Sequence, residues 1–270
     1  MNVARSCNLT RWLVLLTSVG LGTPLLTFAQ FGPAAPPAPL GRQGAPQDLT
    51  GYWVAVVTED WRYRMVTPQR GDFPGVPLNA AGRKLANEWD PAADETRGEQ
   101  CKAYGAGAIM RVPTRLHISW QDEHTLRVDT DAGEQTRLFH FGASAAEDTS
   151  PPSWQGYSVA SWEGLRPRGG NLTVVRAAGS AAGSVQEGYL KVVTTRLRPG
   201  YLRKNGVPYS GEAAVEEYFD SFKEPNGDTW LIVTSIVSDP RFLAQPFITS
   251  SQFKKLASSA GWNPTPCQAQ

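Results

Sequence analysis

Carboxylate side chains on predicted β-strands are the groups best suited to carry out chemistry in this sequence. Glu217 lies in segment 214–222, where strand alternation places it on the same face as Val215 and Phe219. A carboxyl group facing an apolar interior is desolvated, which raises its pKa and suits it to general acid–base catalysis. A strand carboxylate also commonly faces water or pairs with arginine, and the sequence leaves this structural alternative open.

Two further residues complete the candidate catalytic set. Tyr218 offers a phenol as a hydrogen-bond donor, although strand alternation places it on the opposite face from Glu217. Glu163 directly follows Trp162 at the end of a predicted strand. With Glu217 as the acid–base group, these residues would support a lyase, hydratase or isomerase that needs no cofactor.

The familiar catalytic and cofactor motifs do not occur in the sequence. The three histidines, His117, His124 and His140, are separated by seven and sixteen residues, which matches no metal-binding motif. There is no Gly-x-Ser-x-Gly nucleophile elbow. The glycine-rich segment 105–108 follows Cys101 in a predicted loop, so it does not indicate dinucleotide binding. The sequence therefore predicts neither a metal nor a cofactor.

Aromatic residues favour a different kind of site, a cavity for a small, largely hydrophobic molecule. The chain has nine tryptophans, and each combines a large apolar surface with one N–H group. The residues expected to line the cavity are Trp53, Tyr63, Trp120 and Trp162, with Tyr218 beside them. Binding is the first hypothesis and catalysis in the same cavity is the second. In a third, the rings fill the core and the protein has a structural role in the cell envelope.

Composition narrows the class of partner. Lys and Arg total 26 and Asp and Glu total 25, so no charge excess points to nucleic acid or to an anionic membrane surface. Hydrophobic residues make up 41% of the chain, which is enough for a full core. No feature of the sequence specifies an oligomeric state. The expected partner is a small apolar molecule.

The N-terminus has the three parts of a secretory signal peptide. Two arginines precede an apolar run over 12–28, and Thr27 and Ala29 supply the small residues that a signal-peptidase site requires. The run is interrupted by glycine and proline and is short for a membrane span. We expect residues 1–29 to be removed and the mature protein to be periplasmic or secreted, without a membrane span. A retained anchor is the alternative.

The rest of the sequence divides into a linker and one domain. Residues 30–48 are rich in Pro, Ala and Gly and lack apolar periodicity, which predicts a disordered tether. Residues 49–270 form the predicted domain. Cys101 and Cys267 are the two cysteines that remain after cleavage, and one disulfide is their simplest outcome in an oxidising compartment.

The domain sequence predicts short strands separated by turn residues. Segment 115–120 shows the pattern, since Leu116, Ile118 and Trp120 share one face. Strands are expected over 51–58, 61–66, 114–120, 125–131, 135–141, 157–162, 172–177, 189–197, 214–222 and 229–237. Helices are expected over 79–89 and 250–259.

These elements predict an all-β fold with one or two short helices. An open sheet of about ten sequential antiparallel strands has two exposed edges, and closure into a barrel removes them. The expected architecture is an antiparallel up-and-down barrel of about 8–10 strands, and a two-sheet sandwich is the alternative.

The start of the domain resembles a known family of barrels. Gly51-Tyr52-Trp53 opens the first predicted strand and resembles the Gly-x-Trp opening of lipocalins and the wider calycins. The resemblance implies a calycin-like barrel in which Trp53 points inward and closes one end. It also implies that an arginine from a late strand or the C-terminal tail covers the Trp53 ring. The candidates by position are Arg196, Arg198 and Arg241.

Most of the expected mature chain is also similar to a group of exported bacterial proteins of unassigned function. The matching stretches are 81–83, 89–91, Cys101, 110–113, 161–164, 206–210, 217–219 and 239–240. Members of the group usually have histidine in the segments that match Val159 and Tyr209, and this chain has neither histidine. The resemblance implies a fold and an exported location, and it implies no activity.

Overall fold

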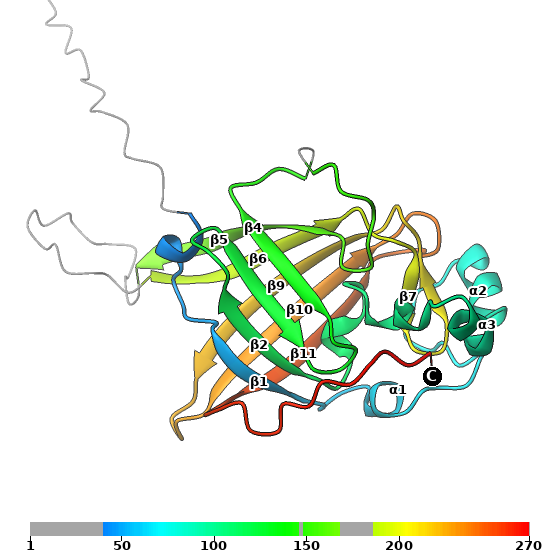
Figure 1. Ribbon diagram of the computed structural model, residues 1–270, viewed down its shortest axis with the longest axis horizontal. Helices are drawn as coiled ribbons and strands as arrows, with labels where there is room; N and C mark the ends of the chain where they lie inside the picture. The colour runs from blue at the N-terminus through cyan, green and yellow to red at the C-terminus, as the bar shows by residue number, and fades with distance from the viewer. Residues whose placement is uncertain (1–39, 146–147, 168–185, 270) are drawn as a thin grey trace, which may run out of the picture. The chain divides into compact units, whose positions relative to one another are not determined.

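Nine strands of the protein close into a barrel, as the computed structural model of the chain shows (Figure 1). The structure describes residues 40–145, 148–167 and 186–269, which all belong to one compact unit. Around the barrel the strands follow the order β1-β11-β10-β9-β6-β5-β4-β3-β2. The all-β barrel expected from the sequence is therefore confirmed, and the two-sheet alternative is not the fold adopted.

The secondary-structure elements have the following bounds. The barrel strands are β1 (Gly51–Val56), β2 (Arg115–Trp120), β3 (Thr125–Thr130), β4 (Thr136–Phe141), β5 (Tyr157–Pro167), β6 (Gln186–Thr195), β9 (Ala214–Lys223), β10 (Thr229–Ser238) and β11 (Phe247–Leu256). A separate hairpin consists of β7 (Gly200–Arg203) and β8 (Val207–Tyr209). The helices are α1 (Trp61–Met65), α2 (Ala80–Asn87) and α3 (Pro91–Thr96), with 3₁₀ turns η1 (Gly41–Gly44), η2 (Gln100–Tyr104) and η3 (Ile109–Arg111).

One pair of barrel strands departs from the predicted antiparallel arrangement. β4 and β5 run parallel, with Phe139 opposite Ser158 and Phe141 opposite Ala160. The other neighbouring pairs in the barrel are antiparallel. Parallel neighbours require the chain to return along the sheet between them, so the hairpin order expected from the sequence breaks at this point.

Two segments fold differently from their sequence predictions. Segment 61–66, expected as a strand, forms helix α1, because Asp60 adopts a left-handed conformation (φ 50°) and its carbonyl accepts the first hydrogen bonds of the turn. Segment 250–259, expected as a helix, largely continues strand β11, because β11 pairs with both β1 and β10 and closes the barrel. The expected strand 172–177 lies outside the described residues.

Side chains from all nine strands pack the barrel interior. Along β10, Leu231, Val233, Ser235 and Val237 are buried, whereas the residues that alternate with them are only half-buried, as strand alternation requires. Phe139 of β4 and Phe219 of β9 meet edge to face across the interior, with ring centroids 5.4 Å apart. The interior of the barrel is therefore a packed core in which most side chains are hydrophobic.

Trp53 is part of this core and is fully buried. Its Nε1–H donates to the carbonyl oxygen of Leu49 at 2.9 Å, and Lys255, its cross-strand partner on β11, lies over the ring with Nζ 5.2 Å from the centroid. The inward orientation expected of Trp53 is confirmed. The expected arginine partner is wrong, because a lysine on the adjacent strand covers the ring. The position over the Trp53 ring that was expected for Arg196, Arg198 or Arg241 is therefore occupied by Lys255.

Residues just before the barrel are ordered, so the predicted tether over 30–48 is wrong for residues 40–48. Trp162 Nε1–H donates to the carbonyl oxygen of Gly41 in η1 at 2.7 Å. The side chain of Gln47 accepts a hydrogen bond from the Ser221 N–H at 2.8 Å. The predicted signal peptide and the first part of the tether lie outside the described residues.

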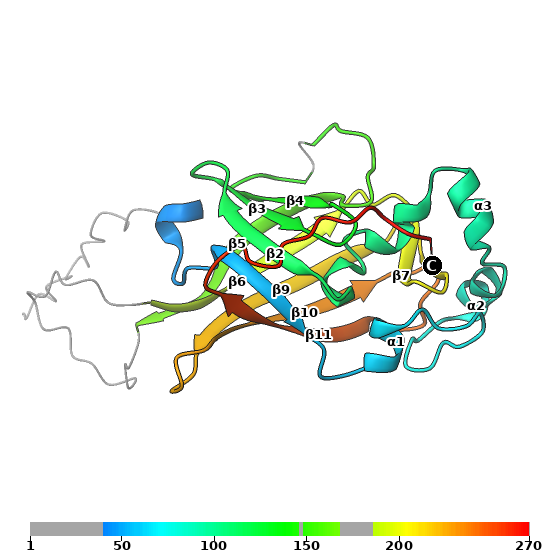
Figure 2. The same cartoon turned by 60° about the horizontal axis from the view of Figure 1, so that its bottom comes forward.

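The C-terminal tail is fixed by the predicted disulfide, which the structure confirms. Cys101 in η2 and Cys267 are bonded, with Cα atoms 5.1 Å apart. Figures 1 and 2 show the tail returning toward the end of the barrel where α1, α2, α3 and β7 gather. No helix among the described residues has the length and apolar character needed to cross a membrane.

Candidate functional site

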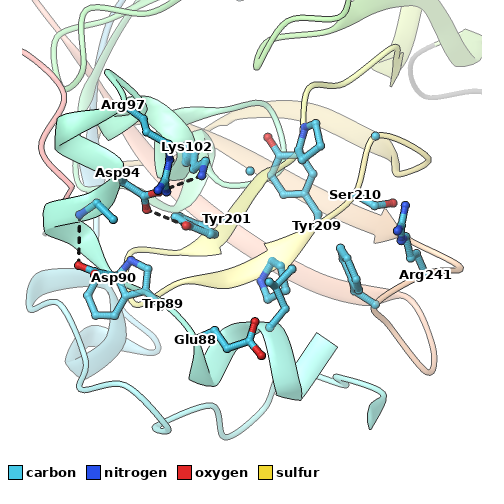
Figure 3. Close-up of a pocket in the computed structure, with 17 residues that line it drawn as sticks. Glu88, Trp89, Asp90, Asp94, Arg97, Lys102, Tyr201, Tyr209, Ser210 and Arg241 are labelled. Carbon is cyan, nitrogen blue, oxygen red and sulfur yellow. Dashed lines mark hydrogen bonds and ion pairs between the residues drawn. The ribbon is translucent and has the colours of Figure 1, made fainter. Parts of the chain in front are cut away.

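A cleft with a volume of about 540 Å³ lies between α2, α3 and the β7–β8 hairpin (Figure 3). Its main apolar lining residues are Leu85, Trp89, Tyr201, Tyr209 and Phe242. The charged residues that border the same space are Glu88, Asp90, Asp94, Arg97, Lys102 and Arg241. The cleft therefore combines aromatic surface with groups that can bind polar atoms.

Two helix caps set the positions of α2 and α3 at the cleft. The side chain of Asn79 caps α2 by accepting the Gly82 N–H at 2.9 Å. Asp90 caps α3 by accepting two backbone N–H groups, at 3.1 and 3.2 Å. Gly82 also packs closely, since a Cβ there would lie 2.4 Å from the carbonyl oxygen of Phe242. Trp89 is thereby held between two capped helices.

Tyr209, which is fully buried, depends on glycines for its place at the cleft. A Cβ on Gly105 would lie 2.3 Å from the Tyr209 hydroxyl oxygen, and a Cβ on Gly200 would lie 2.5 Å from it. The glycine-rich segment 105–108 thus makes room for an aromatic ring. The hydroxyl group has no hydrogen-bond partner among the described residues, and burial raises the pKa of Tyr209.

Trp89 is held by a glycine in the same way. Gly206 has φ +80°, and a Cβ there would lie 2.2 Å from Cγ of Trp89. The indole is nearly buried, and its Nε1–H finds no acceptor within the described part of the chain. Position 206, in the turn of the β7–β8 hairpin, therefore has to be glycine for Trp89 to pack against it.

A buried carboxylate organises the charged wall of the cleft. Asp94 accepts hydrogen bonds from the Tyr201 hydroxyl at 2.7 Å, from Lys102 Nζ at 2.9 Å and from Arg97 Nη2 at 2.6 Å (Figure 3). Burial, followed by the hydrogen bond to Asp94, raises the pKa of Tyr201. Tyr201 is therefore a neutral phenol at ordinary pH, oriented by Asp94.

Glu99 extends this network away from the cleft. It contacts Lys102 Nζ at 2.7 Å, Arg97 Nε at 2.9 Å and Arg198 Nη2 at 3.0 Å. The hydrogen bonds from Lys102 and Arg97 lower the pKa of Glu99 to about 2. The network fixes Lys102 beside the aromatic surface of the cleft.

The candidate acid–base residue Glu217 lies inside the barrel and away from this cleft. Its carboxylate accepts hydrogen bonds from Arg137 Nη1 at 3.0 Å and Nη2 at 2.5 Å, and both side chains are fully buried. Arg137 also donates to Thr194 Oγ1 at 3.2 Å. Glu217 thus faces inward as expected, and its surroundings match the structural alternative, a carboxylate paired with arginine.

The other two candidate catalytic residues lie on the outer surface of the barrel. The Tyr218 hydroxyl donates to Glu216, and Lys191 Nζ lies 5.5 Å from the centre of the Tyr218 ring. Glu163 is 4.0 Å from the same Lys191 Nζ. Lys191 therefore brings Tyr218 and Glu163 together, while the barrel wall separates them from Glu217.

Three of the four aromatic residues expected to line a cavity inside the barrel belong to the hydrophobic core or pack against it. Trp120 and Trp162 contact Phe141, with ring centroids 5.5 and 5.4 Å away. Both tryptophans pack against the core that contains Trp53. Tyr63 lies on α1 and borders a separate cavity beside the arginines of that region. The four residues do not form one site.

The residues that form the cleft show no pattern in the sequence that predicts a site. They come from three distant segments, 85–102, 199–211 and 241–242, so no local spacing connects them. Trp89 and Asp90 meet Pro208, Tyr209 and Ser210 at the cleft only because the fold brings these segments together.

The histidines do not assemble a metal site in the described parts of the chain. His117 stacks on Tyr52 with ring centroids 4.3 Å apart, and His140 stacks on Tyr157 at 4.9 Å. Within those parts, no group of three or more His, Cys, Asp or Glu side chains could hold a metal ion.

Comparison with known families, curated proteins and solved structures finds no match to the chain.

Proposed function

We propose that the protein binds a small, largely apolar molecule in the cleft between α2, α3 and the β7–β8 hairpin. The observation that carries the proposal is the gathering of Trp89, Tyr201, Tyr209 and Phe242 around a space of about 540 Å³. Small-molecule sites commonly have volumes of about 300–1,000 Å³ and aromatic linings with a few polar groups. The barrel interior, by contrast, is occupied by core side chains.

The lining suggests what kind of molecule fits. Aromatic surfaces favour a ligand with a flat or ring-shaped apolar body. Arg97 and Arg241 lie on opposite sides of the cleft (Figure 3), so polar atoms at the edge of such a ligand would find donors. We therefore propose an apolar ligand with polar substituents at its edge.

Catalysis inside the barrel has less support than binding in the cleft. Glu217 is fully buried and engaged with Arg137 on two hydrogen bonds, so a substrate would have to displace packed core residues to reach it. Tyr218 and Glu163 lie on the outer surface. We assign the cleft a binding role for these reasons.

We also propose that the protein is exported and works in the periplasm or outside the cell. The N-terminal sequence motivates this proposal, and the Cys101–Cys267 disulfide supports it because such bonds persist in oxidising compartments. N-terminal sequencing of the protein recovered from the periplasm or the medium should begin at Gln30. An intact N-terminus on protein that stays in the cytoplasm would contradict the proposal.

A matched pair of substitutions tests binding in the cleft. Leu85 borders the cleft and is 41% exposed, whereas Phe222 on β9 is 43% exposed and is not among the cleft residues. Fluorescence titration with N-phenyl-1-naphthylamine, a neutral apolar dye, should saturate on the unaltered protein. Leu85→Glu should weaken binding at least about tenfold, because a carboxylate against an apolar ligand must be desolvated.

Phe222→Glu is the control and should change the dye affinity by less than about twofold, since it introduces the same charge on equally exposed apolar surface. Equal losses in the two variants would show that the dye binds elsewhere. Absence of saturable binding to the unaltered protein would also contradict the proposed function.

A further inference from the structure

Three buried arginines gather at a second cavity, next to helix α1 and outside the cleft. The cavity has a volume of about 310 Å³, and Arg64, Arg111 and Arg203 all border it. Each of the three is at least nine-tenths buried. Thr265 and Gln268 of the C-terminal tail also line the cavity.

Arg64 has an incomplete set of partners. Its Nε–H donates to the carbonyl oxygen of Arg111 at 2.9 Å, which fixes the direction of the side chain. Its Nη1 and Nη2 atoms are buried and have no hydrogen-bond partner among the described residues. A guanidinium group presents these nitrogens as a fork that matches the two oxygens of a carboxylate or phosphate.

The neighbouring arginines already have partners. Arg111 Nη2 lies 2.8 Å from the Asp60 carboxylate, and Arg203 Nη2 lies 3.9 Å from the same carboxylate oxygen. Arg203 Nη1 also donates to the carbonyl oxygen of Pro74 at 2.8 Å. The Asp60 carboxylate is therefore shared by Arg111 and Arg203, whereas Arg64 contacts Asp60 through its backbone N–H, which donates to the Asp60 carbonyl oxygen at 3.1 Å.

The other carboxylates nearby do not neutralise Arg64 by contact. Glu59 acts on Arg64 only at longer range, and Asp72 pairs with Arg62 at 2.8 Å. Burial, and then repulsion by Arg111, lower the pKa of Arg64. Burial and repulsion by Arg111 also lower the pKa of Arg203. Among the described residues no Asp or Glu borders the cavity, so its lining is positively charged.

We infer that this cavity binds an oxyanion, a carboxylate or phosphate group, through the free face of the Arg64 guanidinium. Two parallel N–H···O bonds from Nη1 and Nη2 would satisfy the two partnerless nitrogens and supply the missing counter-charge. Arg203 lies beside the anion and adds to the positive potential. The inference does not depend on ligand binding in the cleft.

Exposed apolar side chains lie next to the cavity. The oxyanion could therefore be a free ion or part of a molecule with an apolar chain. Met65 borders the cavity and is 58% exposed, and Trp61 at the start of α1 and Val66 just after its end are also exposed. An apolar chain attached to the anion would lie against these side chains. Inorganic phosphate and octyl phosphate present the same oxyanion without and with such a chain, so they distinguish the two sources.

The experiment is isothermal titration of the full chain with inorganic phosphate and with octyl phosphate, at an ionic strength kept constant with sodium chloride. Both ligands should bind at one site per chain. Arg64→Gln should weaken phosphate binding by about 10- to 100-fold, the range expected for a lost charge-assisted pair. Arg62→Gln is the matched control, since Arg62 is on the same helix with its side chain 67% exposed, and should change affinity less than about threefold.

Tighter binding of octyl phosphate than of phosphate would extend the site onto the apolar surface, and equal binding would confine the site to the oxyanion. Absence of saturable binding by either ligand would overturn the inference, and so would equal losses in the two variants. If Arg64→Gln does not fold, the unaltered protein still gives an answer through its arginine side-chain N–H resonances. Phosphate should shift the Arg64 signal and leave that of Arg137 in place, and an unchanged Arg64 signal would overturn the site.

Discussion

Two buried arginines, one inside the barrel and one beside α1, differ in how many partners compensate their charge. Arg137 is matched by two hydrogen bonds to Glu217 and a third to Thr194. Arg64 has one backbone acceptor, and its two terminal nitrogens have no partner among the described residues. Both side chains are almost completely buried.

The difference lies in where the counter-charge comes from. Inside the barrel, β4 supplies Arg137 and β9 supplies Glu217, so the closed sheet itself delivers both members of the pair. Beside α1, the available carboxylate of Asp60 is taken by Arg111 and Arg203. A buried charge without an internal partner is costly, which makes the α1 region suited to binding and the barrel suited to stability.

Removing the disulfide should have the largest effect on stability, and it should distinguish the α1 region from the barrel interior. The bond closes a loop of 166 residues, and loop-closure entropy gives it a stabilising effect of up to about 5 kcal/mol. The tail that it holds forms a wall of the arginine cavity and does not touch the Arg137–Glu217 pair. The double substitution of Cys101 and Cys267 by Ser should lower stability in guanidinium unfolding and weaken phosphate binding. An unchanged unfolding midpoint would contradict this.

Substituting one member of each region compares them directly. Glu217→Gln leaves the Arg137 charge unpaired in the core and should cost about 3–5 kcal/mol of unfolding free energy. Arg64→Gln separates no ion pair and should cost about 1 kcal/mol or less, the scale of its one hydrogen bond to a backbone carbonyl. Urea unfolding of both variants without phosphate measures the difference. Similar losses of unfolding free energy in the two variants would contradict the distinction between the paired Arg137 and the partly unpaired Arg64.

Uncharged polar groups at the cleft should also differ according to whether they have a hydrogen-bond partner. Tyr209→Phe removes a buried hydroxyl that has no partner among the described residues, so stability should stay level or rise by up to about 1 kcal/mol. Ser210→Ala is the contrast, because Ser210 Oγ donates to the buried Asp239 at 2.8 Å. Losing that donor should cost about 1–3 kcal/mol. Thermal unfolding that ranks Tyr209→Phe as the more damaging variant would contradict the assignment.

The smallest expected effect concerns pH. Glu99 has its pKa lowered from 4.5 to about 2 in the folded protein, so the unfolded chain takes up the proton first as the pH falls. The stabilisation from Glu99 is therefore complete above about pH 4.5 and is lost as the pH falls toward 2. Unfolding curves between these pH values should be less pH-dependent for Glu99→Gln. Identical pH dependence in variant and parent would rule out this role.

The barrel could be predicted from the sequence because its strands alternate between buried and exposed residues. That alternation also placed Glu217 correctly on the inner face of β9. Arg137 shares its strand face with Phe139 and Phe141, so an inward arginine opposite an inward glutamate was readable in principle. The pair went unrecognised because the pattern of one strand does not reveal which other strand it faces across the barrel.

The sites outside the barrel could not be predicted in the same way. Segment 61–66 has alternating aromatic and charged residues, which favours a strand, but the left-handed turn at Asp60 makes it a helix and directs Arg64 inward. The cleft depends on contacts such as Gly105 with Tyr209, which are about a hundred residues apart. Packing of this kind depends on the whole fold, so it cannot be predicted from the spacing of residues along the sequence.

The central claim is that small molecules bind outside the barrel while its interior stays closed. The most direct measurement is a crystal structure of the protein grown with N-phenyl-1-naphthylamine. We predict density for the dye against Trp89 and Phe242, with the Arg137–Glu217 pair intact. Dye density inside the barrel, with Arg137 and Glu217 moved apart, would contradict the claim.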